Sequence, residues 1–398
     1  MVKGFAFVCL MCVAAGMAWG ADVTVSGSGG SGKVGIDLGG LTAAGQGGAL
    51  KQVLIEDLKR SGWFTMAAGG GVEVRGQCVS GGGSARIDAE VINPATATRY
   101  FSRAYEEPTA TWRRAAHRLA DDIVKAVKNK PGMANARIAL IGAPGGKKNL
   151  FICDADGQGL VQLTRDNKPC MTPAWSPDMR TIYYMSFHTG YADTYSIELG
   201  SRTRKKVAGF PGINANPAVS PSGQQLAIIL SRDGNSELYV MSTGGGGASR
   251  LTRTGEAAEA SPCWSPDGGQ IAYVSDRSGS PQVYTVSRSG GSPTRVTHRG
   301  NENVNPDWGA DGRLAYSSRR GGRYQVCVLD PRTGVETQIT TGGADYEEAS
   351  WAPDGRHLVA AKTSGYHSDL YLLDTLGDPE VRLTTMQGDW YSPAWSPR

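Results

Sequence analysis

The alternation of apolar and polar residues differs between two parts of the chain. From about residue 137 onward, short segments alternate residue by residue between apolar and polar side chains, and turns rich in Gly, Pro, Ser and Asp separate them. This period of two predicts half-buried β-strands. Before that point, two longer segments carry apolar residues three and four positions apart, which predicts amphipathic helices. The chain is therefore expected to be mostly β, with a small α/β part preceding it.

The β part repeats one sequence unit. Segments such as "PAWSPD" (173–178) and "PCWSPDG" (262–268) recur roughly every 44 residues, a period that fits a four-stranded propeller blade. The residue at the centre of the segment is Trp175, Val219, Trp264, Trp308, Trp351 or Trp395. We expect these side chains to pack between neighbouring blades.

Turns and strands follow in a fixed order within one unit. The stretch "SPDG" (265–268) has the residue preferences of a type I turn, with Pro second and Gly fourth. The segments "QIAYVS" (270–275) and "QVYTVS" (282–287) then alternate as strands, and "TRVT" (294–297) ends the unit. Each unit is therefore expected to form one antiparallel sheet.

The number of predicted strands also indicates how the repeated units close into a ring. There are six inner strands of the "PAWSP" type and six sets of three outer strands, the first set beginning at Arg137. The first set has no inner strand before it, and the last inner strand, 393–396, has no set after it. Pairing these two makes a ring, which protects the strand edges. We predict a six-bladed β-propeller over 134–398; an open solenoid of the same strands is the structural alternative.

The smaller α/β part is expected to span residues 21–133. The stretches 48–62 and 111–127 have helical spacing of their apolar residues. Between them, 85–105 is predicted to form a hairpin that turns near Pro94.

The first 20 residues predict export. Lys3 gives a positive start, an apolar run follows, and Ala18-Trp19-Gly20 is a small-x-small cleavage pattern. We predict a signal peptide over 1–20 and a periplasmic mature protein. A membrane anchor is the alternative, but the apolar run is shorter than the roughly 20 residues that a spanning helix needs.

Neither the cysteine content nor the net charge predicts a further binding or catalytic site. The cysteines that remain after the predicted cleavage are Cys78, Cys153, Cys170, Cys263 and Cys327. They are odd in number and form no C-x-x-C pair, so buried free thiols are the simplest interpretation, and the sequence names no disulfide. A net charge of +4 is too weak to indicate nucleic acid or an anionic membrane as partner.

One glycine-rich stretch resembles a phosphate-binding loop. In "VSGSGGSGKVG" (25–35), Gly27, Gly32 and Lys33 have the spacing of that motif. The motif needs Ser or Thr after the lysine to hold magnesium and a helix that starts there. This chain has Val34 followed by an extended segment, so we predict no nucleotide site and interpret the glycines as a flexible joint.

No catalytic residue or resident cofactor is predicted. The chain has no G-x-S-x-G and no H-E-x-x-H motif, and its five histidines are scattered. The stretch "DADGQG" (154–159) begins like a calcium loop but lacks the downstream Glu, which favours a plain hairpin turn.

The linkers that lead into the inner strands are expected to meet at one face of the ring, around its central channel. They carry several carboxylates with little positive charge, together with asparagines and aromatic residues. Such a mouth suits a basic or amide-rich peptide segment, or a cation such as calcium; an ordinary solvated loop face is the alternative. The candidate partner-binding residues are Asn214, Asn216, Glu259, Ser261, Asn303, Asn305, Glu347, Glu348, Asp389 and Tyr391.

The order of these parts resembles the TolB family, the periplasmic component of the Tol-Pal envelope system. The similarity includes the glycine-rich turn, "LKQVLIEDLKRSGWF" (50–64), "LADDIVKAVKNKPGMANARIALIG" (119–142) and the "WSPDG"-type repeats. It departs from the family pattern at Ile213, at Ala260-Ser261 and over 68–84. These departures bear on the partner contacts and leave the fold expectation intact.

The resemblance implies a non-enzymatic scaffold that supports outer-membrane integrity and its invagination at division. It implies a monomer that binds the peptidoglycan-associated lipoprotein Pal at the propeller mouth, with neither nucleic acid nor direct membrane insertion. By the family motif, the Pal-facing positions would be Asn214, Asn216, Glu259 and Ser261, of which Ser261 is a candidate through this resemblance alone. The resemblance also implies that the mature N-terminus engages TolA, through Ala21, Asp22, Val23, Thr24 and Val25. The alternative is a secreted propeller that binds a peptide or saccharide, or a hydrolase that uses the acidic channel with a recruited metal.

Overall fold

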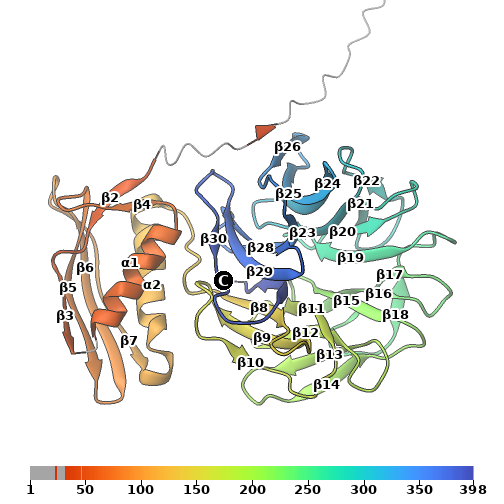
Figure 1. The fold of residues 1–398 in the computed structure, drawn as a ribbon, viewed down its shortest axis with the longest axis horizontal. Helices are drawn as coiled ribbons and strands as arrows, with labels where there is room; N and C mark the ends of the chain where they lie inside the picture. The colour runs from red at the N-terminus through yellow and green to blue at the C-terminus, as the bar shows by residue number, and fades with distance from the viewer. Residues whose placement is uncertain (1–22, 25–31, 46, 398) are drawn as a thin grey trace, which may run out of the picture.

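The computed structural model describes residues 23–24, 32–45 and 47–397, and its architecture is mostly β (Figure 1). A smaller α/β part comes first, and six radial sheets follow it around a central axis. Among the described residues, no helix has both the length and the apolar character to cross a membrane. The predicted signal peptide lies outside the described residues.

The α/β part is one mixed sheet covered by two helices. Its strands are β2 (Val34–Asp37), β3 (Leu41–Gly45), β4 (Phe64–Met66), β5 (Val72–Gly81), β6 (Ser84–Asn93) and β7 (Thr98–Pro108). They lie in the order β4-β2-β5-β6-β7, with β3 also paired to β5. The helices are α1 (Gly47–Arg60) and α2 (Arg113–Lys128), with a short 3₁₀ turn (Thr109–Thr111) before α2. Figure 1 shows both helices on the side of the sheet that faces the propeller.

The two predicted helices and the predicted hairpin are present. In α1 the apolar stripe through Leu50, Leu54 and Leu58 is fully buried against the sheet. Strand β5 was not anticipated, because its middle breaks the alternation with an exposed stretch. Gly76 lies there with φ 130°, and a Cβ at this position would come 1.9 Å from the carbonyl oxygen of Asp88. Only glycine fits so close to β6.

The first three blades each contain four antiparallel strands, which follow one another from the axis outward. Blade 1 contains β31 (Trp390–Trp395), β8 (Arg137–Gly142), β9 (Asn149–Asp154) and β10 (Val161–Gln162). Blade 2 contains β11 (Cys170–Trp175), β12 (Thr181–Ser186), β13 (Asp193–Glu198) and β14 (Arg204–Ala208). Blade 3 contains β15 (Asn214–Val219), β16 (Gln225–Leu230), β17 (Glu237–Ser242) and β18 (Ala248–Arg250).

The remaining blades repeat the pattern. Blade 4 contains β19 (Glu259–Trp264), β20 (Gln270–Ser275), β21 (Gln282–Ser287) and β22 (Thr294–Arg295). Blade 5 contains β23 (Asn303–Trp308), β24 (Leu314–Arg320), β25 (Arg323–Asp330) and β26 (Val335–Gln338). Blade 6 contains β27 (Asp345–Trp351), β28 (His357–Ser364), β29 (His367–Asp374) and β30 (Val381–Arg382). A further strand, β1 (Val23–Thr24), pairs in parallel with β26.

The C-terminal strand closes the ring, as the repeat count predicted. Strand β31 pairs with β8 in antiparallel register, with Trp395 opposite Ile138. The indole N–H of Trp175 in blade 2 donates a hydrogen bond of 2.9 Å to the carbonyl of Ala394 in blade 1. Trp264 makes the same bond to Ala218 of the preceding blade, at 3.0 Å. These tryptophans therefore pack between blades, whereas Trp308 is only half-buried and bonds to Gly312 in its own blade.

The α/β part meets blade 1 through charged groups. His117 of α2 is 1 % exposed, and its Nδ1 lies 2.6 Å from a carboxylate oxygen of Asp57 on α1. Its Nε2 faces Asp154 of blade 1 at 3.7 Å. Arg113 pairs with Asp154 at 3.4 Å and also with Asp156. The contact is thus a buried network of alternating charge.

A second network joins the α/β part to blade 6. The Arg356 guanidinium lies over the ring of Trp63, 4.4 Å from its centroid, and bonds to Asp374 at 2.6 Å. Lys33 forms an ion pair of 2.8 Å with Asp378. Lys33, the lysine of the loop-like stretch, thus contacts a propeller carboxylate. The predicted boundary at 133–134 falls between α2 and β8, and its status as a domain boundary stays a prediction.

These networks predict a stability that falls at alkaline pH. Burial alone would lower the pKa of His117, but Asp154 and Asp57 outweigh it and raise this pKa to about 9. Asp354 and Asp374 likewise raise the pKa of the buried His357 to about 9. A raised folded-state pKa gives stability that is complete below the unfolded-state value of roughly 6.5 and is lost as the pH rises through the folded-state value.

We therefore expect the melting temperature to fall between pH 7 and pH 9.5, measured by calorimetry. His117→Asn and His357→Asn should each start from a lower melting temperature at pH 7 and show a flatter pH profile. A wild-type profile that stays level over this range would contradict the protonated-histidine interpretation.

Candidate functional site

Each inner strand contains the same backbone irregularity near its start. The pairing with the next strand shifts register at this point in all six blades. The third residue, or the fourth in β27, adopts a positive φ: Thr172 (49°), Asn216 (50°), Ser261 (46°), Asn305 (50°), Glu348 (55°) and Ser392 (44°). In five of the six strands a proline follows, which has no N–H for the sheet and disfavours the α conformation in the residue before it. A proline at this point costs the sheet no ladder hydrogen bond, because the bulge leaves the position unpaired, and β27 forms the same bulge with Ala349 in place of proline.

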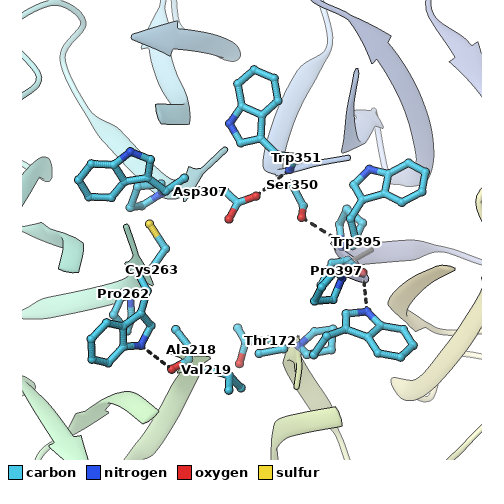
Figure 2. Close-up of a pocket in the computed structure, with 18 of the residues that line it drawn as sticks. Thr172, Ala218, Val219, Pro262, Cys263, Asp307, Ser350, Trp351, Trp395 and Pro397 are labelled. Atoms are coloured by element: carbon cyan, nitrogen blue, oxygen red, sulfur yellow. Dashed lines mark hydrogen bonds between the residues drawn. The ribbon is translucent and has the colours of Figure 1, made fainter. Parts of the chain in front are cut away.

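The six positive-φ residues all line an axial cavity of about 580 Å³. Figure 2 shows side chains of the inner strands arranged in a ring around an open centre, with Thr172 on one side and Asp307 and Ser350 on the other. We call the six positive-φ residues the mouth ring. They lie near the end of the channel where the inner strands begin.

The mouth ring is only partly satisfied by its own hydrogen bonds. The backbone N–H and hydroxyl of Ser392 donate to Glu348, at 2.7 and 2.9 Å. The amide of Asn305 donates to the hydroxyl of Ser261 at 3.4 Å. The buried hydroxyl of Thr172 has no hydrogen-bond partner among the described residues. The polar groups of the mouth ring are thus not all paired with one another.

Two carboxyl groups of the inner strands, Glu347 and Asp307, have a raised pKa, and of the two only Asp307 lines the cavity. Burial, followed by the charges of Glu348 and Asp345, raises the pKa of Glu347 to about 7. Burial raises the pKa of Asp307 to about 6, although this carboxylate accepts the N–H of Trp351 at 2.7 Å. Asp307 was not among the residues predicted from the sequence. The sequence nevertheless contained a signal for it. Asp307 directly precedes the last residue of its inner strand, where the other five inner strands carry Ala, Cys or Ser.

Three of the predicted contact residues are structural. Asn214 and Asn303 are fully buried. The Asn214 amide donates to the carbonyl of Phe210 at 2.8 Å, and that of Asn303 donates to Gln282 at 2.7 Å. Glu259 is 2 % exposed and pairs with Arg277 at 2.8 Å, while burial raises its pKa. These side chains hold the linkers in place, which corrects the expectation that they face a partner.

The expected excess of free negative charge at the mouth is also wrong. Arginines at the adjoining ends of β24 and β25 reach the linkers, with Arg319 at 2.8 Å from Glu302 and Arg323 at 2.7 Å from Asp345. His367 lies 2.8 Å from Asp389. The predicted residues that remain partly exposed at the mouth are Asn216, Ser261, Asn305, Glu347, Glu348, Asp389 and Tyr391.

The structure describes only part of the predicted N-terminal strand. Val23 and Thr24 form β1, in register with Thr337 and Gln338, whereas Ala21, Asp22 and Val25 lie outside the described residues.

The five cysteines of the predicted mature chain are buried and unbridged, which confirms the interpretation as free thiols. They are Cys78, Cys153, Cys170, Cys263 and Cys327.

A metal site finds little support in the described part of the chain. His117, Asp154 and Asp156 form the single group of three potential ligands there. Arg113 already pairs with both carboxylates, so a cation of the protein occupies the place where a metal would bind. This group also lies at the junction with the α/β part, away from the mouth where calcium was considered.

Residues 124–398 match the family model of the TolB beta propeller domain, which therefore covers more than half of the chain. The chain belongs to this family. A Tol-Pal system protein TolB from Alcanivorax borkumensis is 35% identical over 156 residues, which cover 38% of this chain and 36% of that relative. One from Methylococcus capsulatus is 33% identical over 192 residues, covering 42% and 45%. The chain thus spans less than half of the length of these curated relatives that it matches.

Solved structures of the family agree with the fold. The crystal structure of TolB from Acinetobacter baumannii superposes with a TM-score of 0.82 at 27% identity, covering 92% of this chain and 97% of that one. A putative TolB from Agrobacterium tumefaciens gives 0.54 at 22% identity, covering 64% and 90%, and supports the fold alone. The prediction of a six-bladed propeller with a preceding α/β region is therefore confirmed.

The buried asparagines of the linkers and the half-exposed asparagines of the mouth ring are expected to contribute differently to the stability of the fold. Asn303→Ala should lower the free energy of unfolding by about 2 kcal/mol, because it leaves the buried Gln282 side chain and a linker carbonyl without their donor. Asn305→Gly is the matched control, since glycine tolerates a positive φ and the removed amide is half-exposed. Urea unfolding measures both. Equal losses would contradict the assignment of Asn303 as structural.

Proposed function

We propose that this chain is a non-catalytic adaptor of the Tol-Pal system, exported to the periplasm. In this proposal the propeller mouth binds a Pal-like lipoprotein, and the N-terminal strand binds a TolA-like protein. Together the two contacts link the outer membrane to the inner membrane and support envelope integrity and invagination at division. The membership in the TolB propeller family and the names of its relatives support the system.

The mouth ring is the main structural support for the proposed lipoprotein-binding site. It places half-exposed amide, hydroxyl and carboxylate groups around an open cavity, on strands that the sheets hold rigidly. A concave site with few convergent polar groups and little need to reorganise suits a loop of a protein partner. Tyr391, half-exposed beside the ring, adds an aromatic anchor of the kind found at interface centres.

The N-terminal strand suits a separate, exchangeable contact. Strand β1 pairs with β26 through Val23 and Thr24 alone. Such a short pairing adds few backbone hydrogen bonds, so a partner that offers a longer strand edge can compete for the same segment. The glycine-rich stretch that follows lies mostly outside the described residues, and its sequence predicts a flexible joint between this strand and the α/β part.

Calorimetric titration with the soluble domain of the peptidoglycan-associated lipoprotein from the same organism tests the mouth. Asn216→Gly removes an amide while glycine tolerates the positive φ, and Glu348→Gln removes a negative charge while its amide oxygen can still accept the bonds from Ser392. Together they should weaken binding at least about tenfold. Arg288→Ala, on an exposed turn at the other end of the blades, is the control. Unchanged binding in the double variant would contradict the assignment of the mouth.

Deletion of residues 21–25 tests the second contact. We expect the deleted protein to lose binding to a TolA-like C-terminal domain while it keeps the full affinity for the lipoprotein, because the mouth ring does not involve these residues. Surface plasmon resonance with both partners measures this. Retained binding to the TolA-like domain, or loss of both, would overturn the division of roles.

A further inference from the structure

The mouth face carries, on one side, four cations that no carboxylate of the described residues pairs with. Lys147 and Lys148 lie in the turn 143–148 between β8 and β9, and Arg165 and Lys168 lie in the linker 163–169 between β10 and β11. Lys147, Arg165 and Lys168 are exposed, and Lys148 is half-buried. We call these four residues the basic sector.

Hydrogen bonds show that the segments of the basic sector form one continuous surface. The N–H of Cys170, directly after the linker, donates to the carbonyl of Lys148 at 3.2 Å. The next turn, 187–192 of blade 2, is joined to the same linker, because the N–H of Phe187 donates to the carbonyl of Pro169 at 3.1 Å. Three neighbouring loops are therefore held side by side at the mouth.

The one carboxylate within these loops does not neutralise the basic sector. Asp166 is bonded to His188 and to Arg204, the latter at 2.6 Å. Elsewhere on the same face the arginines of the turns are paired, as Arg277 is with Glu259 and Arg319 with Glu302. Arg253, in the linker between β18 and β19, is also exposed and has no carboxylate partner among the described residues, but the exposed Glu256 lies in the same linker. The unpaired positive charge of this face is therefore concentrated in the sector of blades 1 and 2, although the net charge of the whole chain is only +4.

Two aromatic residues connect this charge to a protein-binding surface. The ammonium group of Lys148 lies 4.5 Å from the centroid of the Tyr391 ring, which is itself next to Ser392 of the mouth ring. Tyr191, in the turn 187–192, is 74 % exposed. Exposed tyrosine beside Lys and Arg without carboxylate partners is typical of a protein interface, where aromatic anchors and complementary charges combine. A small anion would not account for the exposed tyrosine.

We propose that the basic sector docks a carboxylate-rich surface of the protein that occupies the mouth, with Tyr191 packing at the edge of the contact. This inference rests on the proposed function, since it assigns the chemistry of the partner at the same mouth. The four cations attract the acidic surface during approach and fix the rotation of the partner about the propeller axis. Their contribution should therefore act mainly on the association rate and fade with added salt.

The test measures association kinetics with the lipoprotein domain named above, at about 25 mM and about 300 mM NaCl. Lys147→Glu/Arg165→Glu/Lys168→Glu reverses three charges of the sector. Arg180→Glu/Arg202→Glu/Arg288→Glu makes the same change on exposed turns at the other end of the blades. We expect the sector variant to associate at least about tenfold more slowly at low salt and the difference to shrink at high salt, while the control stays within about twofold of wild type.

A single substitution tests the aromatic part of the contact. Tyr191→Ala should leave the association rate unchanged and raise the dissociation rate several-fold, because it removes apolar contact area and no charge. Thermal melts of all variants establish that they are folded. An unchanged dissociation rate would remove Tyr191 from the interface.

The outcomes separate this inference from the proposed function. Equal slowing of the sector and control variants would overturn the inference, because net charge alone would then explain the effect. Normal association of the sector variant, together with weakened binding of Asn216→Gly/Glu348→Gln, would overturn the inference and leave the proposed function standing. A wild-type protein that does not bind the lipoprotein domain would overturn both.

Discussion

Closure of the ring by the C-terminal strand is the constraint on which the rest of the structure depends. Strand β31 lies more than 240 residues after its partner β8, and blade 1 has no inner strand without it among the described residues. The hydrogen bond from Trp175 to Ala394 then ties blade 2 to this same strand. The axial cavity exists because all six inner strands are held at one radius. A local loss at the terminus would therefore open both the edge of the sheet and the site.

The candidate site at the mouth and the fold depend on the same repeated residues. The proline of the repeat cannot donate to the neighbouring strand, and the residue before it takes up a positive φ that turns it toward the channel. A second repeated device holds the outer strands. In blades 1, 3 and 4, the hydroxyls of Thr164, Thr252 and Thr297 each accept the N–H of the second residue of the third strand, at 2.9 Å. Sequence variation at the channel position can therefore change the chemistry of the mouth without changing the blade.

The contacts between the α/β part and the propeller differ in kind from the contacts between neighbouring blades. Neighbouring blades share apolar clusters, as in the contact of Trp175 with residues of blade 1. The core of the α/β part forms a separate cluster, and its contact with blades 1 and 6 consists largely of the His117 and Arg356 networks. Interfaces built on charge depend strongly on geometry and protonation, since each buried ion must keep its partner. The position of the α/β part is thus more sensitive to its surroundings than the blades are.

The sequence by itself determined the blades, their number and their closure, because period-two alternation and the "PAWSP" repeat express local rules of strands and turns. Both helices of the α/β part also followed from their apolar stripes. Strand β5 did not, because the fit of Gly76 against Asp88 replaces a side-chain pattern there. Tertiary structure alone decided that Asn214, Asn303 and Glu259 are internal. It also paired the linker carboxylates with distant arginines and left the basic sector of blades 1 and 2 without such partners, because burial and ion pairing depend on side chains that meet only after the ring has closed.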